Sequence, residues 1–338
     1  MERTAILLTA IVSMAVTGIL GFWLIPWLKK LKYGQTINEI GPRWHKGKEG
    51  TPTIGGLMFI IGSIVGLAVG YVSLILDAPQ FLSVQYSTEN VRLFAGLGAA
   101  LGFGLVGFID DYMKVIHERN LGLTAKGKIA MQIVVIAAYL YVMNKFGGAT
   151  TEFKLPFGPT VDFGIWYYLI SMLAMIYFVN AVNLTDGIDG LATTVTFVVS
   201  CGFIVISTLL GYIGTGLLST AIAAGCVGFI IWNFYPAKVF MGDTGSMFLG
   251  GAVVAMGYGV SFPTLLFFAG VVYIIEALTV VIQVLYFKAT HGKRLFKMTP
   301  IHHHFEMSGW SEIKIVTVFS LVALVGVLAA IAAAVTTA

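Results

Sequence analysis

Ten long apolar segments, separated by short polar loops, constrain the fold of this chain more than any other feature. Scanned with a window of roughly 19 residues, the sequence contains them at residues 4–28, 54–76, 91–109, 129–146, 164–180, 190–212, 214–232, 245–262, 264–287 and 314–336. Each is about long enough to cross a bilayer as a helix, which satisfies the backbone hydrogen bonds inside the segment. Only 11% of the residues are charged, against roughly 25% in soluble domains. The sequence therefore predicts an all-α, polytopic membrane protein.

The chain reads as one domain over residues 1–338, because it contains no repeat, low-complexity tract or linker. Its first apolar segment ends in Lys29-Lys30 rather than at a small-residue cleavage site, so we expect it to be retained as a helix. Cys201 and Cys226 fall inside predicted spans, where a thiol is usually inert. Gly96, Ala100 and Gly104 recur every fourth residue, which indicates close helix packing.

The basic residues predict the orientation of the bundle in the membrane. All of the 20 lysines and arginines except Arg3, Arg92, Lys145 and Lys154 fall in alternate loops or at their edges. Basic loops face the cytoplasm. With an even number of crossings, both termini are therefore expected on the extracytoplasmic side.

Most of the carboxylates near the membrane are expected on the same cytoplasmic face as the lysines. Asp110 and Asp111 close the third segment, and Lys114 follows three and four residues later. Adjacent carboxylates near a bilayer repel each other, and a cation such as Mg²⁺ shared with a phosphate would offset this. The alternative is a solvated helix end with a local salt bridge.

The connection between the fifth and sixth segments holds two amides and two acids. Asn180, Asn183, Asp186 and Asp189 fall in this stretch together with two glycines. A plain turn with one capping Asp is the alternative. Two acids three residues apart beside an apolar span exceed what capping requires, which favours a binding role.

A third polar cluster leads into the eighth segment and contains Asn233, Lys238, Phe240 and Asp243. Gly, Thr and Ser at the helix start leave N–H groups open to an anion, while Asp243 either caps the helix or binds a metal. As the third acidic site on one face, Asp243 favours a metal.

Three consecutive histidines, His302, His303 and His304, precede the last segment. A structural zinc site is not expected from three adjacent histidines without cysteines. Phosphate binding or proton transfer suits them better than a merely polar loop. Glu276 lies near the middle of the ninth segment. An intramembrane acid indicates a functional site, although a helix break or a paired donor would also accommodate it.

Two basic loops have ambiguous roles. Lys46 and Lys48 precede a Gly- and Thr-containing stretch, and Lys126 and Lys128 precede the fourth segment. Either pair can anchor the topology or bind phosphates.

These clusters, in this order, resemble the polyprenyl-phosphate N-acetylhexosamine-1-phosphate transferases over residues 46–306. The matching motifs are Lys48-Glu-Gly-Thr-Pro-Thr-Ile-Gly-Gly, Asp110-Asp111-Tyr-Met-Lys114, Asn180-Ala-Val-Asn183-Leu-Thr-Asp186-Gly-Ile-Asp189-Gly, Gly242-Asp243-Thr-Gly-Ser246 and Pro300-Ile-His302-His303-His304-Phe-Glu306. The histidine motif resembles the muramoyl-pentapeptide branch of the family. The family's ten spans and extracytoplasmic termini agree with the topology expected above.

The resemblance implies a multi-pass enzyme of the bacterial inner membrane, with its active site on the cytoplasmic face, that performs the first membrane step of peptidoglycan synthesis. The implied substrates are UDP-N-acetylmuramoyl-pentapeptide and undecaprenyl phosphate, the products are lipid I and UMP, and Mg²⁺ is required. Membrane lipids are the expected surroundings, a homodimer is a candidate assembly, and no nucleic-acid partner is expected.

The resemblance also implies a role for each motif residue. Asp243 would bind Mg²⁺, and Asp110 and Asp111 would be the catalytic pair. The phosphates would be bound by His302, His303, Lys114 and Lys126. His304 and Lys48 would also contact the substrate. The nucleotide side would include Asp186 and Asp189, and Asn233 and Phe240 would help hold uridine. Asn180 and Asn183 would also bind substrate. Which of Lys46 and Lys48 faces the nucleotide stays open.

Three alternatives remain open from the sequence. Asp110 either positions or deprotonates an attacking polyprenyl phosphate, or it is itself a nucleophile that forms a phospho-enzyme. A sister transferase would use UDP-N-acetylglucosamine instead. A secondary transporter is disfavoured, because transporters place substrate sites near the midplane and show paired repeats.

Overall fold

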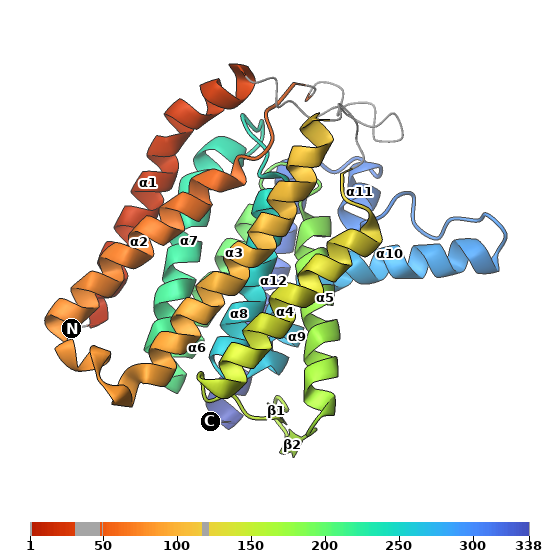
Figure 1. Cartoon of the computed structure of the whole chain (residues 1–338). Coiled ribbons are helices and arrows are strands. Elements are labelled where there is room, and N and C mark those ends of the chain that lie inside the picture. Colours follow the sequence, from red (N-terminus) through yellow and green to blue (C-terminus); the bar gives the residue numbers. More distant parts are fainter. Residues whose placement is uncertain (1, 31–47, 49, 117–121, 338) are drawn as a thin grey trace.

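The computed structural model describes residues 2–30, 48, 50–116 and 122–337, and it is an almost entirely helical bundle (Figure 1). Its elements in chain order are α1 Glu2–Lys30, α2 Gly56–Asp77, η2 Pro79–Leu82, η3 Val84–Tyr86, α3 Ser87–Ile116, α4 Ala125–Lys145, β1 Glu152–Lys154, β2 Thr160–Asp162, α5 Trp166–Thr185, α6 Leu191–Leu210, α7 Ile213–Asn233, α8 Gly242–Gly259, η4 Pro263–Leu265, α9 Leu266–Ala269, α10 Val271–Ala289, α11 Ile301–Glu306 and α12 Glu312–Thr337. The two strands form one antiparallel hairpin.

The prediction of a polytopic all-α protein is confirmed. Within the described residues, nine helices are long and apolar enough to cross a bilayer. The remaining predicted span, 245–262, corresponds to α8, in which every residue from Thr244 to Gly259 is buried. The outer helices instead expose large apolar side chains, such as Trp23 at 68%, Leu76 at 75% and Val325 at 68%. Such surfaces suit lipid as the solvent.

The ninth predicted span, 264–287, is wrong as a single helix. The structure divides it into η4, α9 and α10, with Gly270 between the last two. A Cβ at Gly270 would lie 2.6 Å from Phe178 Cε1, so glycine at the break allows the close approach of α5. Beyond it, α10 projects sideways out of the bundle (Figure 1).

Small residues set the closest helix contacts. Three glycines of α2 pack directly against hydroxyl groups of α1. A Cβ added to any of them would lie within 2.0 Å of a hydroxyl oxygen: Gly62 faces Thr17, Gly66 faces Ser13 and Gly70 faces Thr9. On α3, a Cβ at Gly104 would lie 3.2 Å from Phe248 Cβ on α8, which confirms the predicted close packing of the small-residue ridge. Backbones that approach this closely are typical of membrane helices.

The two ends of the bundle differ in chemistry. Both termini lie at the end that carries β1 and β2, whereas α11 and residues 50–55, which lead into α2, lie at the opposite end (Figure 1). At the hairpin end, the buried Arg92 donates hydrogen bonds to Gly259 O at 2.8 Å and Ser261 Oγ at 2.6 Å. This cation therefore joins α3 to the end of α8.

Candidate active site

Three carboxylates from distant parts of the chain meet where α3 ends and α8 begins. One oxygen from each of Asp110, Asp111 and Asp243 lies within 4.8 Å of the others, and we call these three residues the acid cluster. The approach depends on Gly107, because a Cβ there would lie 2.0 Å from Asp243 O. α3 thus delivers its two acids directly against the first turn of α8.

Asp111 is the most constrained member of the acid cluster. Its side chain is 4% exposed. Its Oδ2 accepts hydrogen bonds from the backbone N–H of Thr244 at 2.9 Å and from Thr244 Oγ1 at 2.7 Å, and its Oδ1 accepts one from Asp243 N at 3.2 Å. Two of these donors are free N–H groups of the helix start, where negative charge is favoured. Asp111 therefore holds α8 in place.

Two lysines neutralise part of the acid cluster. Lys114 Nζ lies 2.6 Å from Asp110 Oδ2 and 2.8 Å from Asp243 Oδ2. Lys128 Nζ lies 3.0 Å from the same oxygen of Asp243. Lys126, which the family resemblance implied for the phosphates, is exposed on the first turn of α4. Of the two neighbouring lysines, it is Lys128 that contacts the acid cluster.

The two predicted amides of α5 have different surroundings. Asn183 Nδ2 donates to Asp243 Oδ1 at 2.8 Å, which fixes the rotamer of this carboxylate. Asn180 instead exchanges hydrogen bonds with Gln132 of α4 at 2.9 and 3.3 Å, and it donates to Ile176 O. Asn183 therefore contacts the acid cluster directly, whereas Asn180 joins α4 to α5.

Asp186 ends α5 beside these groups. It is half-buried by exposed area, but protein surrounds its carboxyl group. This loss of hydration raises the pKa of Asp186 well above its usual range, and the charges of Asp243 and Asp111 add to the effect. An Asp with such surroundings, in a cleft beside other acids, is a functional-site candidate.

A buried ion-pair cluster joins Lys48 to the turn that contains Asp189 and to the start of α12. Lys48 Nζ lies 2.7 Å from Asp189 Oδ1 and 2.7 Å from Glu312 Oε1. Glu312 Oε2 also accepts the backbone N–H of Asp189 at 3.0 Å, and Asp189 Oδ2 accepts that of Ala237 at 2.9 Å. Burial disfavours the ammonium charge, but hydrogen bonds to the two carboxylates outweigh it and raise the pKa of Lys48.

Glu312 is a site residue that the sequence reasoning missed. It lies in the first turn of α12, beside Lys48 and Asp189, and its side chain is only 8% exposed. Its place before the last apolar segment, on the side where the other acids gather, was the available indication. Lys46, the alternative to Lys48 in this loop, lies outside the described residues.

Asn233 and Phe240 flank the loop between α7 and α8. Asn233 is 2% exposed; its Nδ2 donates to Val239 O at 3.0 Å, and its Oδ1 accepts from Thr193 Oγ1 at 2.8 Å. The backbone N–H of Phe240 donates to Pro52 O at 2.9 Å. The loop is thus fixed to α6 and to the segment before α2, with the Phe240 side chain only partly buried.

The three histidines face three different partners. His302 Nδ1 lies 3.1 Å from Glu276 Oε2, and His303 Nδ1 lies 2.6 Å from Glu306 Oε2. His304 Nδ1 accepts the backbone N–H of Lys297 at 3.1 Å. His304 therefore supports the loop that precedes α11, while His302 and His303 each lie beside a glutamate.

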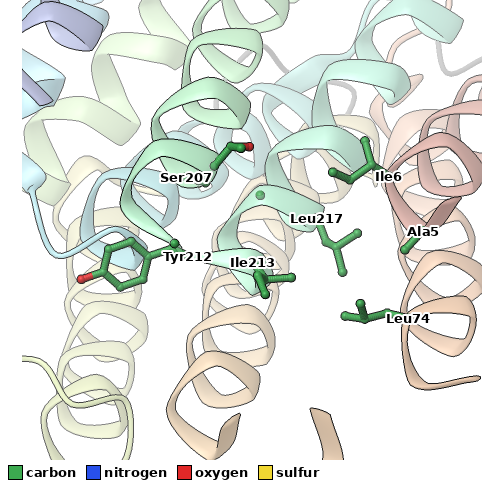
Figure 2. Close-up of a pocket in the computed structure, with 10 residues that line it drawn as sticks. Ala5, Ile6, Leu74, Ser207, Tyr212, Ile213 and Leu217 are labelled. Carbon is green, nitrogen blue, oxygen red and sulfur yellow. The ribbon is translucent and has the colours of Figure 1, made fainter. Parts of the chain in front are cut away.

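The cavity in Figure 2 lies elsewhere. It has a volume of about 190 Å³ and is lined by residues that include Ala5, Leu74, Ser207, Tyr212 and Leu217. α6 begins next to Asp189 and ends at Leu210, so this mainly apolar cavity lies at the opposite end of α6 from the acid cluster. It has no part in the chemistry of the site.

The acid cluster has the donor set of a hard divalent cation. Carboxylate oxygens are the ligands that Mg²⁺ prefers, and it commonly shares them with substrate phosphates. Asp243 has the most exposed side chain of the three, at 19% against 5% for Asp110 and 4% for Asp111. Asp243 is therefore the carboxylate most available to a ligand.

Known proteins match this chain along nearly its whole length. Residues 93–261 match glycosyl transferase family 4, and this range includes Asp110, Asp111, Asp186 and Asp243. The chain belongs to this family. Phospho-N-acetylmuramoyl-pentapeptide-transferase of Halalkalibacterium halodurans is 43% identical over 333 residues, covering 98% of each chain. The protein of the same name from Desulforamulus reducens is 44% identical, covering 96% of this chain and 97% of its own, and that of Clostridium perfringens is 42% identical, covering 95% and 96%. The resemblance that the motifs indicated is confirmed.

Proposed function

We propose that this chain transfers phospho-N-acetylmuramoyl-pentapeptide from its UDP carrier to undecaprenyl phosphate and releases UMP. The observation that carries the proposal is the convergence of Asp110, Asp111 and Asp243 with Lys114 and Lys128 at one end of a membrane bundle. The names of relatives that align over almost the whole chain support the choice of sugar. Acids and lysines around one point suit two phosphorylated substrates and a cation.

We infer that Mg²⁺ binds at Asp243, with the other two carboxylates of the acid cluster nearby. When bound, the ion supplies charge neutralisation for the diphosphate and for the departing UMP. Asn183 holds one Asp243 oxygen, and Lys114 and Lys128 hold the other. These contacts orient the carboxylate before the substrates arrive.

Asp110 is the group closest to the reaction in this proposal. Its Oδ1 accepts the backbone N–H of Leu123 at 2.8 Å, and its Oδ2 contacts Lys114, so the carboxylate is held in one orientation. We favour a direct reaction, in which a phosphate oxygen of the lipid attacks the β-phosphorus and the bond to UMP breaks. Asp110 then positions the lipid phosphate or accepts its proton. The alternative route makes Asp110 the nucleophile.

The remaining motif residues are assigned to binding. The nucleotide side consists of Asp186, Asp189, Asn233 and Phe240, with Lys48 held between Asp189 and Glu312. His302 and His303 are assigned to the substrate phosphates. Asn180 and His304 act through their neighbours, since their hydrogen bonds go to Gln132 and to the Lys297 backbone.

The site is proposed to face the cytoplasm at the inner membrane. All but four of the 20 basic residues belong to the loops of one face or to the edges of those loops, which supports this orientation. Both termini, at the other end of the bundle (Figure 1), are then extracytoplasmic. The lipid substrate would enter sideways from the bilayer, and the nucleotide from water.

A single assay tests the proposal. Purified protein in detergent is given Mg²⁺, undecaprenyl phosphate and either UDP-N-acetylmuramoyl-pentapeptide or UDP-N-acetylglucosamine, and UMP is measured. We expect UMP with the first nucleotide alone, dependent on both the lipid and the metal. Asp243→Asn should abolish most of this activity, because the metal loses its principal carboxylate.

The outcomes separate the alternatives. UMP released only from UDP-N-acetylglucosamine would assign the chain to a sister transferase. Full Mg²⁺-dependent activity of Asp243→Asn would contradict the metal assignment. A phospho-sugar covalently attached to Asp110 in a single-turnover experiment would overturn the direct route in favour of the phospho-enzyme.

A further inference from the structure

A carboxylate and an imidazole are buried together where α10 leaves the bundle. The Glu276 and His302 side chains are both 0% exposed, and Glu276 Oε2 lies 3.1 Å from His302 Nδ1. This is an ion-pair distance, although the angle departs from that of a hydrogen bond. Among the described residues, neither carboxylate oxygen of Glu276 and neither ring nitrogen of His302 has another hydrogen-bond partner.

Such a pair is costly unless its two members compensate each other. A buried ion loses several kcal/mol of hydration, and Glu276 lies in a helix whose outer face is apolar and exposed, as at Leu285 with 63%. The imidazole is the group at ion-pair distance from the carboxylate. If a proton is held on His302, the pair is neutral overall, and the cost of burial falls.

A second pair of the same kind stands beside the first. The His303 ring lies 4.1 Å from the His302 ring, centroid to centroid, and Glu306 Oε2 lies 2.6 Å from His303 Nδ1. Two imidazolium rings at this separation would repel each other. A glutamate at each Nδ1 removes this repulsion, so both rings can carry a proton side by side.

The other nitrogen of His302 faces the nucleotide-side loop. A Cβ added at Gly187 would lie 2.1 Å from His302 Nε2, so this atom rests directly on the turn between Asp186 and Asp189. Because Gly187 has no side chain, the ring can approach the turn this closely, and Nε2 is fully buried against it. The ring is thus oriented with Nδ1 toward α10 and Nε2 toward the turn that carries the two motif acids.

We propose that Glu276 is a positioning residue for His302: its carboxylate, at ion-pair distance from Nδ1, holds the proton there, keeps Nε2 against the turn between Asp186 and Asp189, and compensates the charge of the protonated ring. The inference rests on the proposed transferase function, and it gives the intramembrane glutamate a defined role. Glu276 itself touches no substrate in this arrangement. Its effect on the reaction passes entirely through His302.

A double-mutant cycle tests this dependence. Glu276→Gln keeps the size of the side chain and removes its charge, and we expect kcat to fall about 10- to 100-fold, the usual loss for an orienting partner. KM for both substrates should change by less than about threefold, because the substrate contacts stay in place. His302→Gln should lose at least as much. The double variant should then match His302→Gln within about threefold, because Glu276 has nothing left to orient.

Thr279→Val is the matched control. Thr279 lies one turn further along α10 and its hydroxyl donates to Glu276 O at 2.8 Å, so the variant alters the same helix and leaves the carboxylate in place. It should retain activity within about twofold of the unsubstituted protein. Losses of the two single variants that multiply in the double variant would overturn the proposal. A wild-type protein that releases no UMP would contradict the proposed function instead, which distinguishes the two failures.

A measurement on the unsubstituted protein covers the case in which Glu276→Gln does not fold. With ¹⁵N-labelled histidine, the resonances that disappear in His302→Gln belong to His302. We expect its Nδ1 to be protonated in the unsubstituted protein. A bare Nδ1 would show that Glu276 does not hold this proton, and the proposal would fail.

Discussion

Replacement of Lys114 by methionine tests whether the acid cluster is a cation site. Lys114 Nζ lies within 2.8 Å of oxygens of both Asp110 and Asp243 and 3.8 Å from Asp111 Oδ1. Two carboxylate charges no more than 4.8 Å apart repel by at least about 3.5 kcal/mol at an effective dielectric constant near 20. Because Lys114 is 32% exposed, water screens part of this interaction, and we expect a loss of about 2–4 kcal/mol in the free energy of unfolding without metal.

The assay is thermal unfolding of purified protein in detergent, with EDTA or with Mg²⁺. In EDTA, Lys114→Met should unfold about 4–10 °C below the unsubstituted protein. Mg²⁺ at about 100 times its Kd adds roughly 2.7 kcal/mol of stability, so it should recover most of the difference. The gain from Mg²⁺ should be larger in the variant, since no ammonium competes for the carboxylates.

Lys288→Met is the control, because Lys288 is an exposed lysine in the last turn of α10. It should unfold within about 2 °C of the unsubstituted protein in both buffers. Equal unfolding temperatures of Lys114→Met and the unsubstituted protein in EDTA, or a variant that does not respond to Mg²⁺, would refute the reasoning. In the first case the three carboxylates do not repel, and in the second they do not bind the cation.

Three further predictions concern the groups around the acid cluster. Burial raises the pKa of Asp186, so this group favours the folded state at low pH and loses that contribution as pH rises through its folded pKa. Asp186→Asn should therefore unfold at a higher temperature than the unsubstituted protein at pH 8, with a smaller difference at pH 5. Lys128→Met should lower kcat/KM for UMP release at least about tenfold more than Lys126→Met, because only the former removes a charge-assisted hydrogen bond to Asp243; equal losses would contradict this. Glu312→Gln weakens the hold on Lys48 and Asp189, and it should raise KM for the nucleotide roughly tenfold, as expected for about 1.4 kcal/mol; an unchanged KM would argue against a role at the nucleotide.

The apolar segments predicted the helices well because burial in lipid depends on each segment alone. A run of about 20 apolar residues must satisfy its own backbone wherever it packs. The break at Gly270 escaped this logic, since it falls within a continuous apolar segment, at a glycine packed against Phe178, a residue 92 positions away in the sequence. A local pattern of hydropathy contains no information about such a contact.

The sequence predicted which motifs make up the site, but not which residues of distant segments contact each other. Lys126 and Lys128 are two positions apart, which places them about 200° apart around a helix. Only one of them can face the acid cluster, and the choice depends on how α4 is rotated. Thr124, whose side chain accepts the N–H of Gly127, begins that helix, yet only the packing of α4 on its neighbours sets the rotation. Glu312 and the partner of Glu276 were missed for the same reason, because both pairings join distant segments.

If Mg²⁺ and the UDP-sugar bind as proposed, the charges of the site couple the binding of one to that of the other. With all groups ionised, Asp110, Asp111 and Asp243 carry three negative charges against the two positive charges of Lys114 and Lys128. A lysine that turns toward a substrate phosphate leaves Asp243 without its partner. A divalent cation then has to replace the lysine, and the phosphate that attracted the lysine also attracts the cation.

Mg²⁺ affinity should therefore rise when the UDP-sugar is present, and by linkage the UDP-sugar should bind more tightly with Mg²⁺. Titration calorimetry without the lipid substrate measures both affinities, and the two ratios must agree. We expect a coupling of about 5- to 100-fold, within the usual range for linked sites. In Lys114→Met the coupling should shrink, because one of the charges that moves between acid and phosphate is absent. Independent binding of the two ligands in the unsubstituted protein would mean that the lysines stay on the acids throughout, and the exchange of partners would have no place in the mechanism.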